Sequence, residues 1–226
     1  MFRSIAGRIE MVTLAVILGV GLAANAAAQG KDSGFLKDYS QLKTEKDPLG
    51  VERRIWISPK LTRANYQRVL MEPISFYPSP QPSEKVSMGT LNDLRGYGDS
   101  AMRKAIASVV PLSDASGPGV LKVRVAITAV GVEGNLKPYQ LIPVALAVTV
   151  AKEGAGQGRR DLKLFVESEI TDSVSGEPVA LVVREAQGVQ LKSNEKLTLQ
   201  HAKPQIDKWA ESVQQSLAAR LKPDGK

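Results

Sequence analysis

Apolar and polar residues alternate strictly in the middle of the chain, in the segment VLKVRVAITAV at residues 120–130. Successive side chains of a β-strand point to opposite faces, so this pattern predicts a long strand with one buried face. The buried face takes Leu121, Val123, Val125, Ile127 and Ala129, and the other face takes Lys122, Arg124 and Thr128.

A second alternating region, residues 161–188, predicts a β-hairpin around the turn DSVSGEP at residues 172–178. On the first strand, four apolar residues alternate with four polar ones: Leu162, Leu164, Val166 and Ile170 with Lys163, Glu167, Glu169 and Thr171. After the turn, Val179, Leu181 and Val183 are predicted to return on the inner face.

Two further segments have apolar residues at helical spacing. The first helix is predicted to open at Thr90, which with Asp93 resembles a capping box, and to extend to residue 109. The second is predicted to begin near Pro204, since proline suits the first turn of a helix. Its apolar stripe consists of Ile206, Trp209, Ala210, Val213, Leu217 and Leu221.

The order of these elements predicts the fold class. Residues 66–77 are rich in branched and aromatic side chains and predict a strand that meets a sheet margin or bulge at Pro73. Strand, helix, strand, hairpin and helix together predict a single α+β domain at residues 65–226. In this domain two helices pack on one face of a mostly antiparallel sheet. Residues 29–64 are predicted to form an extended leader ahead of the domain.

The first 28 residues have the pattern of a secretory signal peptide. Arg3 and Arg8 precede an apolar run at residues 11–24, and small residues at 26–28 allow cleavage after Ala28. The alternative is a retained membrane anchor, for which the run is short. The chain has no cysteine, so an exported form has neither disulfides nor a lipid-accepting thiol. The predicted location is the periplasm.

The charge of the exported chain is positive. Two basic residues and one acidic residue leave with the signal, so 28 basic and 22 acidic residues remain, a net charge of +6. Such a surface suits anionic lipid or cell-wall polymer, and export makes nucleic acid an unsuitable partner. The simplest alternative is a soluble surface with scattered charges.

Candidate chemistry is sparse. His201 is the only histidine and lies in a polar segment before the last helix, so neither a Ser-His-Asp site nor a zinc site is predicted. The glycine-rich segment EGAGQGRR at residues 153–160 lacks the phosphate-loop pattern and is interpreted as a linker. The sequence therefore predicts no enzyme activity, no metal and no cofactor.

Charged residues on the predicted strands form the candidate interaction surface. Its members are Lys122, Arg124, Glu167, Glu169 and Arg184. Paired carboxylates could bind Ca²⁺ or do acid–base work. Cross-strand ion pairs on one outward face are the simpler interpretation.

The most apolar stretch of the exported chain is LIPVALAVTV, residues 141–150. It is too short to span a membrane as a helix. It is predicted to be either a buried element or a surface that contacts lipid or another subunit.

Several segments together resemble a bacterial envelope family named domain of unknown function 3313. They are SGFLKDYSQLK, YQRVLMEPISFY, GPGVLKVRVAIT, VESEITDSVSGEPVALVVRE and KWAESVQQSL, and they extend over nearly the whole exported chain. The resemblance implies an envelope protein, and members are usually lipoproteins with a lipidated cysteine just before the SGFL segment. Here that region reads AAAQGKDSGF, without cysteine. The turn DSVSGE is also similar in pattern to a hairpin of curli-secretion-type envelope assembly domains.

These observations favour an exported, non-enzymatic envelope protein that acts through protein–protein contacts in the periplasm. Its partner would be another envelope protein or a second copy of the chain. The alternative is a binding module for anionic envelope material, either cell-wall polymer or a lipid surface.

Overall fold

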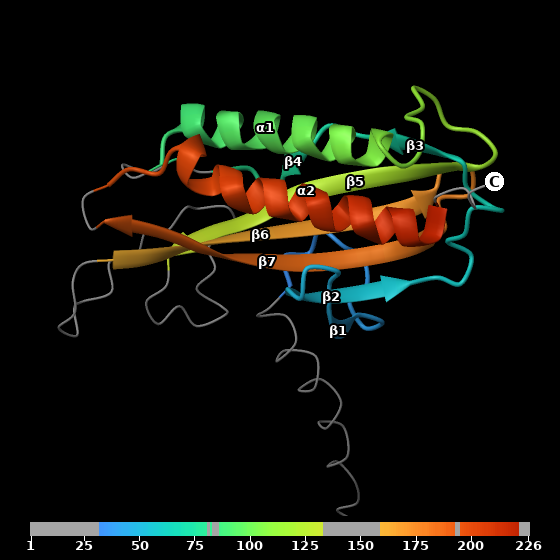
Figure 1. The fold of residues 1–226 in the computed structure, drawn as a ribbon, viewed down its shortest axis with the longest axis horizontal. Helices are drawn as coiled ribbons and strands as arrows, with labels where there is room; N and C mark the ends of the chain where they lie inside the picture. The colour runs from blue at the N-terminus through green and yellow to red at the C-terminus, as the bar shows by residue number, and fades with distance from the viewer. Residues whose placement is uncertain (1–31, 81, 83–85, 133–158, 193–194, 222–226) are drawn as a thin grey trace, which may run out of the picture.

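The computed structural model describes residues 32–80, 82, 86–132, 159–192 and 195–221 (Figure 1). Nine elements follow one another along this part of the chain. They are β1 (Lys43–Lys46), β2 (Glu52–Ile57), β3 (Arg68–Met71), β4 (Ser75–Phe76), α1 (Met88–Ala107), β5 (Val120–Val132), β6 (Arg159–Asp172), β7 (Pro178–Lys192) and α2 (Leu199–Leu221).

The strands form one mixed sheet of seven, in the order β1-β2-β7-β6-β5-β3, with β4 also paired to β5. All pairs are antiparallel except those of β3 and β4 with β5. The hairpin β6–β7, which the two-residue periodicity predicted, lies at the centre of this sheet. Pro73 falls between β3 and β4, so the predicted strand at 66–77 is interrupted there.

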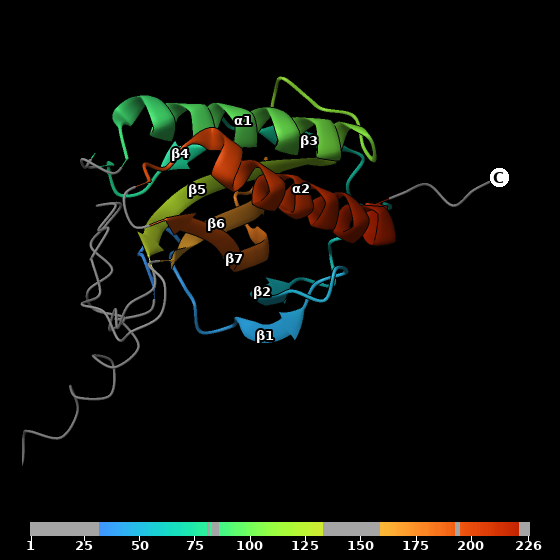
Figure 2. The same ribbon diagram turned by 60° about the vertical axis from the view of Figure 1, so that its left-hand side comes forward.

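Both helices lie on the same face of this sheet (Figures 1 and 2). The main core lies between the two layers and includes Leu91 and Leu221, both 0% exposed, and Trp209. Two side chains join the helices at their surface, because the Tyr97 hydroxyl donates to Asp207 Oδ1 at 2.5 Å. The prediction of an α+β domain with two helices on one face is confirmed.

Both helices begin earlier than predicted. The cap of α1 is Ser87, whose hydroxyl accepts the Thr90 amide at 3.1 Å, so Thr90 lies inside the first turn. Helix α2 begins at Leu199, and Pro204 is inside it, at the sixth position. Pro204 lies beyond the first four positions, whose amides have no acceptor within a helix, so the carbonyl of Gln200 receives no amide from residue 204. The sequence analysis placed the start of this helix about one turn too late.

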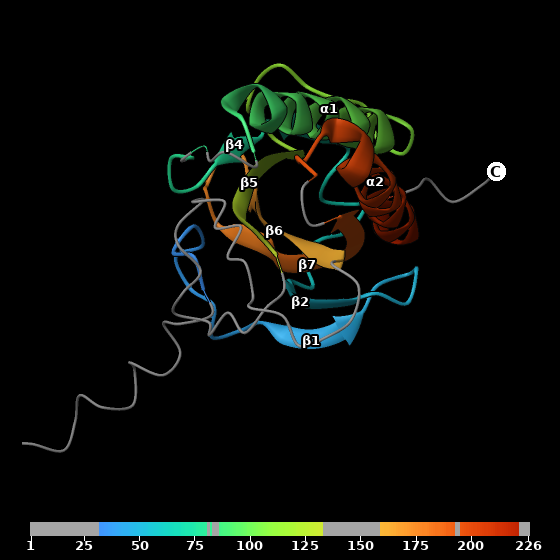
Figure 3. The ribbon, with the colours of Figure 1, turned by 90° about the vertical axis from the view of Figure 1, so that its left-hand side faces the viewer.

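The second face of the sheet is covered by the N-terminal segment. Phe35 and Leu36 are buried there against Ala126 of β5 and Leu181 of β7. Strands β1 and β2 then extend the sheet, and they lie away from α1 in the view along the strands (Figure 3). The predicted leader at 29–64 is therefore wrong for residues 32–64, because apolar side chains and backbone pairing make this part integral to the domain.

A β-bulge in β7 reverses which of its side chains face the helices. Ile170 pairs with Ala180 whereas Thr171 pairs with Pro178, so Val179 is an extra residue in β7. Val179 and Ala180 both join the core under the helices, and Leu181 turns to the opposite face. The prediction that Val179, Leu181 and Val183 share the inner face is wrong for the last two.

Candidate functional site

Four of the five residues of the candidate interaction surface, all except Arg184, lie on the sheet face opposite the helices. Arg124 on β5 is directly opposite Glu169 on β6, and its Nη1 lies 2.7 Å from Glu169 Oε2. Glu72, after β3, extends the pairing, with Oε1 2.6 Å from Lys122 Nζ and Oε2 3.8 Å from Arg124 Nε. The predicted cross-strand pairing is therefore present for Arg124 with Glu169, whereas Lys122 pairs with Glu72, which the sequence analysis did not name.

Glu167 on β6 is part of this face but not of its ion pairs. Its side chain is buried, with 2% of the residue exposed, beneath the N-terminal segment. Its Oε2 accepts a hydrogen bond of 2.6 Å from the Tyr39 hydroxyl. A buried carboxylate must be hydrogen-bonded or paired, so Tyr39 makes this position tenable.

Tyr39 connects the N-terminal segment to the sheet through the hydrogen bonds of its hydroxyl. Its hydroxyl accepts the amides of Gly34 at 3.0 Å and Leu36 at 3.1 Å while donating to Glu167. Gly34 has φ of +87°, a conformation that glycine adopts without strain. Burial, and then the hydrogen bond to Glu167, raise the pKa of Tyr39 to about 12. The tyrosine therefore stays neutral and donates throughout the physiological pH range.

Aromatic and cationic side chains complete this docking. The Arg124 guanidinium lies 5.0 Å from the centre of the Phe35 ring, and Phe35 makes an edge contact with Tyr77 at 5.7 Å. Arg54 on β2 lies over the Tyr39 ring and pairs with Asp32. The motif SGFLKDY is thus a folded cover for the charged face.

Arg184 does not belong to this face, contrary to the sequence prediction. The bulge at Val179 places it opposite Val166, on the helix side of the sheet. There its Nη1 lies 2.8 Å from Asp47 Oδ2, and its Nη2 donates to the Ser212 hydroxyl of α2 at 2.6 Å. Arg184 therefore ties β7 to α2 and to the turn after β1.

Asp47 is the acceptor at the centre of this buried cluster. Its Oδ2 also accepts the Ser212 hydroxyl at 2.6 Å, and its Oδ1 accepts the amides of Leu49 and Val51, both at 2.9 Å. Burial alone would raise the pKa of Asp47, but the Ser212 hydroxyl, the Val51 amide and the Arg184 charge outweigh it and hold that pKa below its usual value. The carboxylate is thus charged, and both of its oxygens accept hydrogen bonds.

The sequence analysis missed both Tyr39 and Asp47. The signal for Asp47 was the segment DPLGV, since aspartate readily accepts amides two and four residues ahead in a turn. No local pattern connects Asp47 with Ser212, which is 165 residues away. The same is true of Tyr39 and Glu167, which are 128 residues apart.

The remaining residues that the sequence analysis named are His201, Ala28 and the stretch 141–150. His201, in the first turn of α2, contacts Glu195 through Nε2 at 3.0 Å and Thr198 through Nδ1. Within the described ranges, no group of three or more metal-ligating side chains comes together, and no helix is both long and apolar enough to cross a membrane. The cleavage residue Ala28 and the apolar stretch 141–150 lie outside the described residues.

Replacing Tyr39 by phenylalanine is expected to lower the free energy of unfolding by about 1–3 kcal/mol. The change leaves Glu167 buried without a donor and removes the acceptor of two amides. Urea unfolding measures the effect. Tyr77→Phe is the matched control, since Tyr77 is 39% exposed. Equal stability of the two variants would contradict the role of Tyr39 in connecting the N-terminal segment to the sheet.

Comparison with known proteins identifies a family and a related lipoprotein. The model of the family "Protein of unknown function (DUF3313)" matches residues 31–213. The uncharacterized lipoprotein YdcL of Escherichia coli K12 is 33% identical over 192 residues, covering 84% of this chain and 86% of that protein.

Two solved structures share a distant similarity. The PelC dodecamer from Paraburkholderia phytofirmans is 14% identical with a TM-score of 0.36, covering 71% of this chain and 96% of that one. A neuraminyllactose-binding hemagglutinin homolog from Helicobacter pylori is 9% identical with a TM-score of 0.39, covering 72% and 86%. Similarity at this level supports no conclusion about assembly or ligands.

Proposed function

Since the chain belongs to the DUF3313 family of proteins of unknown function, we propose that it is an exported envelope protein that acts by binding another protein in the periplasm. The envelope location is supported by the lipoprotein relative and by the signal-like pattern of residues 1–28. The proposed activity is contact and not catalysis.

The observation that carries this proposal is the internal pairing of the buried charged groups. Glu167 is bonded to Tyr39, and Asp47 is bonded to both Arg184 and Ser212. A catalytic carboxylate needs to face a substrate, whereas these carboxylates hold layers of the protein together. What remains for function is the shape and charge of the surface.

The test is crosslinking in living cells, followed by N-terminal sequencing of the recovered protein. We expect discrete crosslinked products with an envelope protein, and a mature N-terminus just after Ala28. Recovery of the protein with Met1 intact would contradict cleavage after Ala28, and crosslinks to cytoplasmic proteins alone would contradict export. Absence of any protein crosslink from a folded, exported protein would contradict the contact function.

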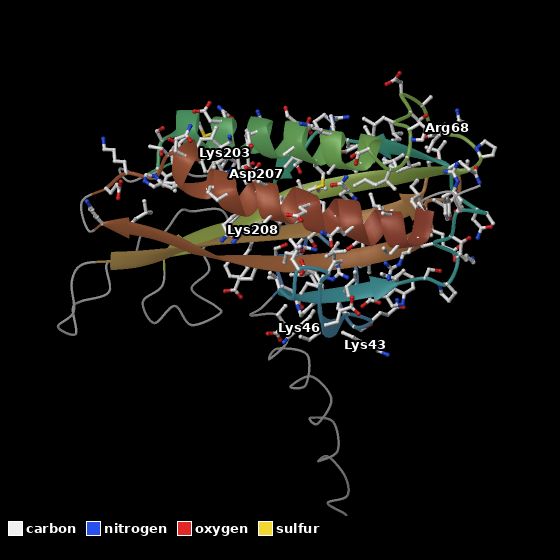
Figure 4. All side chains as sticks on the ribbon, in the orientation of Figure 1. Lys43, Lys46, Arg68, Lys203, Asp207 and Lys208 are labelled. Atoms are coloured by element: carbon white, nitrogen blue, oxygen red, sulfur yellow. The ribbon has the colours of Figure 1, made fainter. Side chains whose placement is uncertain are left out.

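A second candidate function is binding of anionic envelope material. Lys43 and Lys46 project from β1 and Lys208 from α2 (Figure 4), and no described acidic side chain pairs with any of the three. Co-sedimentation with anionic vesicles or cell-wall polymer measures this function. Retention that is lost between low and physiological salt favours it, because screening weakens contacts between exposed charges.

A further inference from the structure

We propose that the free edge of β1 accepts an extended, acidic segment of another polypeptide, which pairs with β1 as an additional strand. This inference rests on the proposed contact function and names its surface and partner class. Paired backbone groups supply affinity in this mode of recognition, and flanking side chains supply specificity.

The two edges of the sheet differ in how they end. At the β3 edge, the Val69 amide donates to Pro111 O at 3.0 Å and the Ser113 amide donates to Val69 O at 2.8 Å, so residues 111–113 cover that edge. At the other edge, all four residues of β1 are exposed. In the described part of the chain, no backbone hydrogen bond reaches the outer side of β1.

The register of β1 identifies the groups available for pairing. The Asp47 amide donates to Val51 O at 2.7 Å, so the backbone N–H and C=O groups of Asp47 point toward β2. Alternate residues of an antiparallel strand direct their backbone groups to the same side, so Lys43 and Glu45 also point inward. The N–H and C=O groups of Thr44 and Lys46 therefore point to the open side.

The edge is held in a pairing conformation before any partner arrives. The Asp47 carboxylate organises the turn after β1 through the amides of Leu49 and Val51. Arg53 on β2 donates from Nη2 to Glu45 Oε1 at 2.8 Å, and the side chain of Arg53 is only 6% exposed. A preorganised edge lowers the entropy cost of binding.

Charge defines the partner. Glu45 is neutralised by Arg53, whereas Lys43 and Lys46 extend from the lower margin of the molecule (Figure 4). Their positions alternate, so one lysine lies on each face of the strand. An incoming strand therefore meets a cation on both faces, which favours glutamate or aspartate. The same lysines disfavour pairing with β1 of a second copy.

The test measures binding of a fluorescent peptide in which pairs of glutamates alternate with pairs of valines, so that both faces of the added strand carry glutamate. Binding is followed by anisotropy with the purified full chain. The same peptide with lysine in place of glutamate is the first control and is expected to bind at least tenfold more weakly. A glutamate peptide with methylated alternate amides tests backbone pairing on the unchanged protein. It is expected to lose at least tenfold in affinity.

Variants of the edge separate strand addition from adsorption. Thr44→Pro removes an amide that faces outward, which an edge strand tolerates, and is expected to weaken binding at least tenfold without changing the melting temperature. Thr44→Val keeps the amide and is expected to bind like the parent. The double change Lys43→Glu with Lys46→Glu is expected to abolish binding, whereas Lys196→Glu with Lys208→Glu, of equal charge, keeps it.

Three results would overturn the inference. The first is equal binding by the proline and valine variants, and the second is equal loss with both double lysine variants, which indicates adsorption by net charge. The third is a dimer of the parent that Thr44→Pro dissociates, which makes a second copy the occupant. If cellular crosslinks persist in Thr44→Pro, the contact function stands and this edge does not mediate it.

Discussion

Asp47→Ala is expected to lower the free energy of unfolding by about 3–5 kcal/mol, because it leaves the guanidinium of Arg184, whose side chain is only 11% exposed, without its carboxylate partner. The change also removes the acceptor of the Leu49 and Val51 amides, so the turn after β1 loses its organising group. Chemical unfolding measures the loss.

Two further variants make this prediction specific. Asp47→Asn keeps an oxygen for the amides but not the charge, so its cost is expected to lie between those of the parent and the alanine variant. Asp38→Ala is the control, because Asp38 is exposed and its carboxylate accepts hydrogen bonds from its near neighbours in sequence, Ser40 and Gln41. A cost for Asp47→Ala no larger than for Asp38→Ala would contradict the buried cluster.

The same carboxylate makes stability depend on pH. The pKa of Asp47 is held below its usual value in the folded chain, so the unfolded chain binds its proton first as the pH falls. The stability that the Asp47 carboxylate contributes is complete above its pKa in the unfolded chain, about 3.9. It is lost as the pH falls through its pKa in the folded chain. Asp47→Asn is therefore expected to flatten the loss of stability in acid.

Trp209→Ala is expected to lower the free energy of unfolding by about 3–5 kcal/mol. Trp209 is 8% exposed and packs in the core between α2 and the sheet, so truncation leaves a cavity there. Thermal unfolding measures the effect. Gln214→Ala, at an exposed position of the same helix, is the control, and equal melting temperatures would contradict the core position of the tryptophan.

The elements that the sequence analysis predicted well are those whose signal is local. The alternation at 120–130 and around the turn at 172–178 identified β5 and the hairpin β6–β7, and helical spacing identified the buried stripe of α2. The cross-strand pair of Arg124 with Glu169 also followed from alternation. Such patterns are visible because a strand repeats every two residues and a helix every 3.6.

The candidate surface was only partly predicted, for two structural reasons. A single extra residue at Val179 inverts the faces of β7, so Arg184 points to the helices and not to Glu167. Composition alone did not indicate that residues 32–42 return to the sheet, because a few apolar side chains in a charged segment give no periodic signal.

The sequence by itself determined the periodic elements of this protein, their order and the helix stripe that meets the sheet. Only the tertiary structure decided what covers the charged face and which acids pair with which bases. Tyr39 with Glu167, and Asp47 with Ser212, are separated by 128 and 165 residues, and such pairs are set by chain packing. Burial then requires each charge to find a partner, and the fold supplies it from the far end of the chain.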